Sequence, residues 1–269
     1  MKRRVYWILG AGRFGRLAVE RLLARREPPH LVVVDQNPEN LLVLADRPVE
    51  RVNENVLDFL RANLGQGPDW IVPAVPIHVA FVWLSGELAG VGQLEALPVP
   101  KAVDAQVPNP WRDGKGGLYT SVATFRCPDN CSEPRDRCTV TGLRRPDDLF
   151  ALLARIRVPG SVPLVVRSHQ LAAGVGGYRP SALRRLMRGA EAARESILVA
   201  TACRCHGVVH ALKWESAKGR GELAGGSGQR AVERLTRSGR SRLAPGVKRP
   251  DAAGHSALTL ADDTGMVSR

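Results

Sequence analysis

Two continuous apolar runs near the N-terminus predict buried β-strands. The runs are VYWIL (5–9) and HLVVVD (30–35). Uninterrupted apolar runs of this length are typical of parallel strands that are covered on both faces. Between them, four apolar residues recur at helical spacing: Phe14, Leu17, Ala18 and Leu22. The pattern therefore predicts a strand, a helix and a second strand.

The residues that follow repeat this alternation. VERV (49–52) and DWIVPAV (69–75) have the composition of strands, and VLDFLRANL (56–64) lies between them with helical spacing. Asn37 is a suitable N-cap for a helix that begins at Pro38, because proline is favoured at the first helical position. Strands that alternate with helices predict an α/β fold with a doubly wound parallel sheet of the Rossmann type.

A glycine-rich turn joins the first predicted strand to the first predicted helix. Gly10, Gly12 and Gly15 form the pattern G-x-G-x-x-G. The first glycine permits a tight turn, the second lets the backbone approach a pyrophosphate, and the third lets the helix pack closely on the strand. Asp35 ends the second strand, where a carboxylate accepts hydrogen bonds from the ribose hydroxyls and repels the 2′-phosphate of NADP. The turn therefore predicts a dinucleotide site for NAD(H), with another adenine nucleotide as the alternative.

The stretches GAGRFG and VVVDQNPEN resemble the NAD-binding N-terminal domain of potassium-transport regulators, the RCK or Trk type, over about residues 4–80. The resemblance implies a Rossmann fold, NAD(H) as ligand, a homodimer, and a membrane potassium channel or transporter as partner. It implies these ligand-binding residues: Gly10, Gly12, Arg13, Phe14, Gly15 and Asp35. This sequence departs from the family after the third strand, where VNEN (52–55) replaces the usual Gly-Asp pair and Asn53 is the remaining hydrogen-bonding candidate.

The five cysteines fall into two groups that are far apart in the sequence. The groups are C-x3-C-x6-C and C-x-C-H: Cys127, Cys131 and Cys138, then Cys203 and Cys205. Thiolates are the ligands that zinc and iron–sulfur clusters prefer. We therefore expect the two groups to share one metal or redox site. The spacing matches no standard motif, so zinc and an iron–sulfur cluster both stay open.

Two other interpretations of the cysteines stay open as well. The thiols of the first group can be free in a loop, and Cys203 and Cys205 can form a redox dithiol. If residues 197–205 form a strand, these two cysteines point to the same face of the sheet.

Two histidines are weak candidates for acid–base catalysis. His169 follows the apolar run VPLVV and precedes a loop that contains Gly174, Gly176 and Gly177. Ligands of α/β proteins bind at such strand ends. His78 follows the fourth predicted strand, near the expected nicotinamide end of a dinucleotide. For both histidines the alternative is a purely structural role, and the next predicted helix is expected to be capped near Ser181.

The net charge of +13 suggests a nucleic-acid partner, but the distribution of the charge does not favour one. Residues 218–269 carry +5 of this charge, contain no aromatic residue, and are expected to be a disordered basic tail. Two further basic clusters lack interleaved aromatic residues and predict solvated faces. The clusters are Arg144–Arg145 and Arg184–Arg185–Arg188.

The N-terminus lacks the pattern of a signal peptide, and the longest apolar stretch (70–84) is interrupted by prolines. It is shorter than the roughly 20 residues of a membrane-spanning helix. We therefore expect a cytoplasmic protein, where clustered cysteines stay reduced and favour metal or redox chemistry over structural disulfides.

These observations predict three regions: a Rossmann domain (1–96), a smaller cysteine-rich α/β region (97–217) and the basic tail (218–269). The expected function is that of an NAD(H)-binding regulatory or sensor protein with a cysteine-ligated metal or redox site. The alternative is an NAD-dependent oxidoreductase that uses an iron–sulfur or zinc centre. Whether the protein is an enzyme stays open, because the sequence shows no complete catalytic set.

Overall fold

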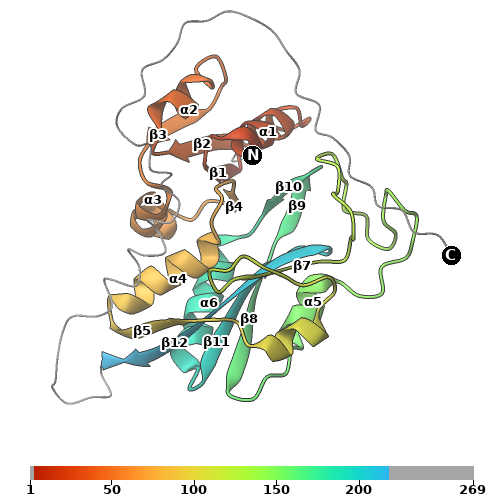
Figure 1. Cartoon of the computed structure of the whole chain (residues 1–269). Helices are drawn as coiled ribbons and strands as arrows, with labels where there is room; N and C mark the ends of the chain where they lie inside the picture. Colours follow the sequence, from red (N-terminus) through yellow and green to blue (C-terminus); the bar gives the residue numbers. More distant parts are fainter. Residues whose placement is uncertain (1–2, 218–269) are drawn as a thin grey trace, which may run out of the picture. The chain divides into compact units, whose positions relative to one another are not determined.

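The first half of the chain forms a four-stranded parallel sheet, with strand order β3-β2-β1-β4 (Figure 1). The computed structural model describes residues 3–217, so the predicted tail lies outside the described residues. The strands are β1 (Val5–Leu9), β2 (His30–Asp35), β3 (Glu50–Asn53) and β4 (Trp70–Pro73). The predicted strands at 5–9 and 30–35 are confirmed.

Helices cover both faces of this sheet. They are α1 (Arg13–Leu23), α2 (Pro38–Leu42), α3 (Val56–Asn63) and α4 (Val79–Ala89). Alternate residues of β1 point to opposite faces. Tyr6 and Ile8 pack in one apolar cluster with α1, whereas Trp7 and Leu9 pack in another with α3 and α4. The predicted doubly wound α/β arrangement is confirmed.

The second half forms a six-stranded mixed sheet, with order β6-β7-β12-β11-β8 and with β5 paired to β12. Its strands are β5 (Gly92–Leu97), β6 (Trp111–Arg112), β7 (Leu118–Ser121), β8 (Ser161–Arg167), β11 (Ser196–Ala202) and β12 (His206–Ser216). β8 and β11 are parallel and are joined through α6 (Pro180–Ala192). The predicted boundary at residue 96 falls within β5.

Shorter elements complete the described chain. They are the 3-10 helices Leu64–Gln66 and Lys101–Gln106, α5 (Leu149–Ala154), β9 (His169–Ala172) and β10 (Val175–Gly177). β9 and β10 form an antiparallel hairpin that turns at Gly174, where φ is +63°. The glycine-rich loop predicted after His169 is therefore largely a hairpin. The helix that follows has Arg179, not Ser181, as its N-cap.

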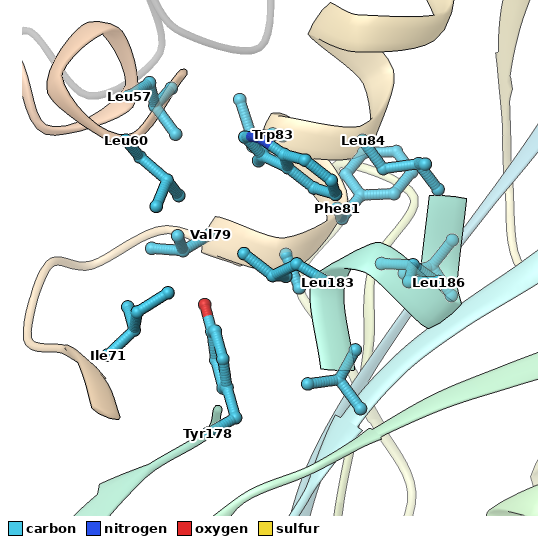
Figure 2. Packing of buried hydrophobic residues seen from close by; sticks show 14 of the residues in the cluster. Leu57, Leu60, Ile71, Val79, Phe81, Trp83, Leu84, Tyr178, Leu183 and Leu186 are labelled. Atoms are coloured by element: carbon cyan, nitrogen blue, oxygen red, sulfur yellow. The ribbon is translucent and has the colours of Figure 1, made fainter. Parts of the chain in front are cut away.

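One apolar cluster connects the two sheets through α4 and α6 (Figure 2). Residues around the whole circumference of α4 are buried, from Val79 to Leu88, because the helix packs both on α3 and on the second sheet. This explains why the stretch 70–84 is apolar throughout: it contains a buried strand and a buried helix. Within residues 3–217, each helix is too short or too polar to cross a membrane.

Candidate functional site

The turn between β1 and α1 contains three glycines. The local structure requires two of them, and packing does not explain the third. Gly10 has a φ of +108°, and an added Cβ would lie 2.8 Å from the carbonyl oxygen of Ala74. At Gly15, an added Cβ would lie 1.9 Å from the carbonyl oxygen of Gly10. Gly12 has an ordinary φ of −67°, and an added Cβ would meet no atom within 4 Å. The backbone at Gly12 therefore faces open space at the N-terminus of α1.

Asp35 holds this turn against the end of β2. Its side chain is buried, and its carboxylate accepts hydrogen bonds from the backbone N–H of Ala11 (2.7 Å) and of Asn37 (2.8 Å). The side-chain amide of Asn40 donates a third bond at 3.3 Å. Asn53 donates to the carbonyl oxygen of Asp35 at 3.0 Å and so ties β3 to β2. A carboxylate has about four acceptor positions, which leaves capacity for a ribose hydroxyl.

Arg13 and Phe14 lie on the side of α1 that faces the cysteines. Arg13 forms an ion pair with Asp129, and Phe14 is 54% exposed and lines the cysteine cavity described below. Arg21, on the same helix, donates to the carbonyl oxygens of Asp129 and Ala173. The sequence pattern did not predict that α1 contacts the cysteines.

All five cysteines line one cavity of about 670 Å³. Three lie in residues 121–148, which we call the cysteine segment, and two lie between β11 and β12. The Val122 N–H donates to Cys205 O at 2.8 Å and so joins these two parts, and the Gly174 N–H of the β9–β10 hairpin donates to Cys131 O at 3.0 Å. The two cysteine groups therefore line one cavity, and a metal or redox site shared between them stays a prediction.

Cys203 and Cys205 do not lie in a strand, in contrast to the strand over residues 197–205 considered from the sequence. β11 ends at Ala202, and Cys203 and Cys205 lie in the turn before β12. In this turn the Cys203 N–H donates to the carbonyl oxygen of His206 at 2.9 Å. The turn forms where two antiparallel strands reverse, so the alternation of a strand does not apply to these cysteines.

The thiols are free and have unequal environments. Burial raises the pKa of Cys203 to about 12 and also raises the pKa values of Cys127 and Cys205. Hydrogen bonds from Thr141 lower the pKa of the Cys138 thiol. Across the described residues, no three His, Cys, Asp or Glu side chains stand close enough to hold one metal ion as they are placed.

Arg145 organises the cysteine segment. Its side chain is only 4% exposed, so the solvated position that we expected from sequence is wrong. The guanidinium donates to the carbonyl oxygens of Pro134 and Arg135, both at 2.9 Å, and to Cys205 Sγ at 3.2 Å. A weaker contact joins Arg145 to Asp148 Oδ1 at 3.5 Å. Sequence reasoning missed the role of Arg145 because its shorter bonds go to backbone and sulfur atoms that the fold brings near.

The two candidate histidines lie in different places. His78 is buried at the start of α4; its Nδ1 lies 3.0 Å from Nδ1 of His210, and its Nε2 lies 2.8 Å from Thr201 Oγ1. Burial and the neighbouring His210 hold the pKa of His78 well below its usual value. His169 begins β9 and packs edge-on against Trp70; burial and nearby arginines lower its pKa. The contacts of His78 join the start of α4 to β11 and β12 of the second sheet.

Comparison with known proteins identifies the family of the second half. A family model described as "Uncharacterized protein, C-terminal domain" matches residues 80–215, and the chain belongs to this family. An uncharacterized protein of Archaeoglobus fulgidus is 34% identical over 224 residues, which cover 77% of this chain and 98% of that protein. No solved structure matches the chain. The matched region contains all five cysteines and most of α4.

Proposed function

We propose that the chain is an NAD(H)-binding regulatory or sensor protein in which the β1–α1 turn binds the pyrophosphate of the dinucleotide. The observation that carries this proposal is Gly12. Neither backbone conformation nor packing requires a glycine at this position. Close approach of a ligand to the backbone supplies the missing reason, since any side chain at Gly12 would occupy the space of the phosphates.

The start of α1 supports the same site. This helix has 11 residues, and its N-cap Gly12 provides no side-chain acceptor for the first backbone N–H groups. Such groups and the positive end of the helix dipole attract phosphate. Asp35 closes β2 beside the turn and would accept a hydrogen bond from the adenosine ribose.

The regulatory part of the proposal rests on the contacts of α1. Arg13 and Arg21 bind the cysteine segment at Asp129, so a ligand that moves the start of α1 would also move this segment. The resemblance to RCK or Trk-type domains supports a regulatory role, and with it a homodimer and a membrane potassium transporter as partner. Cytoplasmic location is part of the same proposal.

The second candidate function is an NAD-dependent oxidoreductase. It is favoured by the position of the cysteine cavity, which Phe14 and Leu17 of α1 line directly. An enzyme also needs a proton-transfer group, and His169 is the better candidate because His78 is buried and paired with His210. Turnover of NADH with an added electron acceptor would favour this candidate over a sensor, which binds NADH without consuming it.

A calorimetric titration of the full chain with NADH tests the binding site. Gly12→Ala is expected to weaken NADH binding at least about tenfold, a loss of about 1.4 kcal/mol. It should change the free energy of unfolding by less than about 1 kcal/mol, the range for replacing an N-cap. Gly65→Ala is the matched control, since an added Cβ there also meets no atom within 4 Å. Equal NADH affinity in all three proteins would contradict the site.

Comparison of NADH with NADPH tests the role of Asp35. The wild-type protein should bind NADH more tightly than NADPH, because a carboxylate repels the 2′-phosphate. Asp35→Asn removes the charge and should erase most of this preference. Its single amide oxygen can accept from only one of the two N–H groups, since Ala11 donates to Oδ2 and Asn37 to Oδ1, so circular dichroism of the variant checks that it is folded. Equal titration curves for the two cofactors in the wild type would rule out the ribose role.

A further inference from the structure

The cysteine segment is held in place without a core of its own. From residue 121 to residue 148, no apolar residue is buried, and from 122 onward the segment has neither a helix nor a regular strand. Burial of apolar side chains normally offsets the entropy lost when a chain is ordered. A segment of this kind is ordered by a bound metal centre in many small metal-binding folds, where ligand binding contributes folding free energy.

The positions of four thiols agree with a common ligand. Cys127, Cys131 and Cys138 of the cysteine segment line the same cavity as Cys205 of the turn before β12. The buried Cys203 lies next to Glu133 and His206. Four thiols from two segments therefore line one cavity. Cys203 lines it as well, but its sulfur already accepts from backbone N–H groups of its own turn, from Cys205 at 3.4 Å and from His206 at 3.3 Å.

Hydrogen-bond donors already point at the sulfur atoms. Cys205 Sγ accepts from Arg145 Nε at 3.2 Å, and Cys131 Sγ accepts from the backbone N–H of Glu133 at 3.4 Å. Donors to sulfur stabilise the thiolate form and tune the potential of a cluster. Glu133 adopts a φ of +47°, a strained conformation for a residue with a side chain, and such strain is typical of ligand sites.

The spacing of the thiols favours a cluster over a single ion, because among the described residues no three His, Cys, Asp or Glu side chains lie close enough to hold one ion, and a cluster spans a larger distance. A zinc ion with Zn–S bonds of about 2.3 Å draws its four sulfur atoms to within about 4 Å of one another. The cavity here is about 670 Å³, with thiols contributed around it and with Phe14, Leu17 and Phe125 among its apolar residues. An apolar surround limits water access and is one of the means by which a protein sets the potential of a metal centre.

We propose that this cavity binds an iron–sulfur cluster through the thiolates of Cys127, Cys131, Cys138 and Cys205, with Cys203 outside the ligand set. Each ligand loses its proton when it binds iron. Arg145 is a positioning residue: it holds the backbone of the segment at Pro134 and Arg135 and donates to the Cys205 sulfur. Phe14 and Leu17 of α1 border this cavity, but its cysteine ligands lie outside the glycine turn, so the proposal does not rest on nucleotide binding.

Analysis of the full chain purified without oxygen, or reconstituted with ferrous iron and sulfide, tests the proposal. We expect a brown protein with broad visible absorption and with iron and acid-labile sulfide in equal amounts. Replacement of any one ligand, as in Cys127→Ser, Cys131→Ser, Cys138→Ser or Cys205→Ser, should remove most of the bound iron. Cys203→Ser is the matched control and should keep the iron content and spectrum of the wild type.

The alternative outcomes are distinct. A colourless protein that contains zinc would overturn the cluster, as would a protein without metal after reconstitution. Loss of iron in the Cys203→Ser variant, with retention in one of the other four, would overturn the ligand assignment. Far-UV circular dichroism of each variant separates loss of a ligand from loss of folding. Since the assay contains no nucleotide, its result leaves the NAD(H) proposal untouched.

Discussion

The glycine turn and the cysteine segment lie next to each other but are stabilised differently. Residues 5–35 form two strands and a helix whose inward side chains are fully buried in two apolar clusters. Residues 121–148 contain no buried apolar residue and are held by hydrogen bonds of Arg145, whose side chain is 4% exposed, and by backbone bonds with Gly174 and the turn before β12. In the first region packing sets the backbone, and in the second polar contacts between distant segments do so. Substitutions should therefore have very different effects in the two regions.

The largest effect is expected from Gly15→Ala. The added Cβ would lie 1.9 Å from the carbonyl oxygen of Gly10, whose own backbone is held because its N–H donates to the carbonyl oxygen of Val34. We expect the free energy of unfolding to fall by about 3 kcal/mol or more. Urea unfolding measures the change, with Gly65→Ala as the control. A loss below about 1 kcal/mol would show that the turn can relax, contrary to this comparison.

The second effect is a loss of stability at low pH. Burial and mutual proximity lower the pKa of His78, and burial lowers that of His210, although Asp113 partly opposes the shift at His210. The folded protein therefore binds fewer protons than the unfolded chain, so this contribution is complete above the unfolded pKa of about 6.5 and is lost as the pH falls. Below the unfolded pKa, the free energy of unfolding falls by up to about 1.4 kcal/mol for each pH unit and for each histidine that the fold keeps neutral.

Urea unfolding between pH 7.5 and pH 5, about one unit or more on either side of the unfolded histidine pKa, measures this slope. Titration of the histidine ring protons by NMR assigns it. Protonation of His78 at or above the usual histidine pKa would contradict the role of burial.

The third effect is stabilising. The hydroxyl group of Tyr178 is buried among Ile71, Val79 and Leu183 (Figure 2) and, among the described residues, it has no hydrogen-bond partner. Tyr178→Phe should raise the free energy of unfolding by about 1 kcal/mol, because it removes a buried unpaired donor. Tyr6→Phe is the control: the Tyr6 hydroxyl accepts from Arg25, so this change should not stabilise the protein. A destabilised Tyr178→Phe variant would reveal an unseen partner.

The smallest effect is expected in the cysteine segment. Val140 is exposed, so Val140→Ser should change the free energy of unfolding by less than about 0.5 kcal/mol. Denaturant unfolding of the metal-free protein gives the value. A clearly larger loss would mean that the segment packs against the fold, and the contrast with the glycine turn would then fail.

Local patterns were sufficient to predict the first sheet. Each of its early elements is set by residues that are close in sequence: the apolar runs at 5–9 and 30–35 and the glycine turn. The spacing of apolar residues is therefore enough to predict them. The same holds for the start of α2, where the side chain of Asn37 accepts from Glu39 N–H as predicted. A strand buried on both faces needs an apolar residue at each position, and this requirement is visible without the fold.

The tertiary structure decided the features that join distant segments. Cys131 and Cys205 line one cavity although they are 74 positions apart in the sequence, and His78 contacts His210, which is 132 positions away. β5 follows the parallel sheet in sequence but pairs with β12, and Arg145 is buried although it looks solvated. Each of these depends on which strands pair and on which backbone carbonyls lie nearby. Such pairing is set by packing over the whole molecule, so it cannot be predicted from a local pattern of residues.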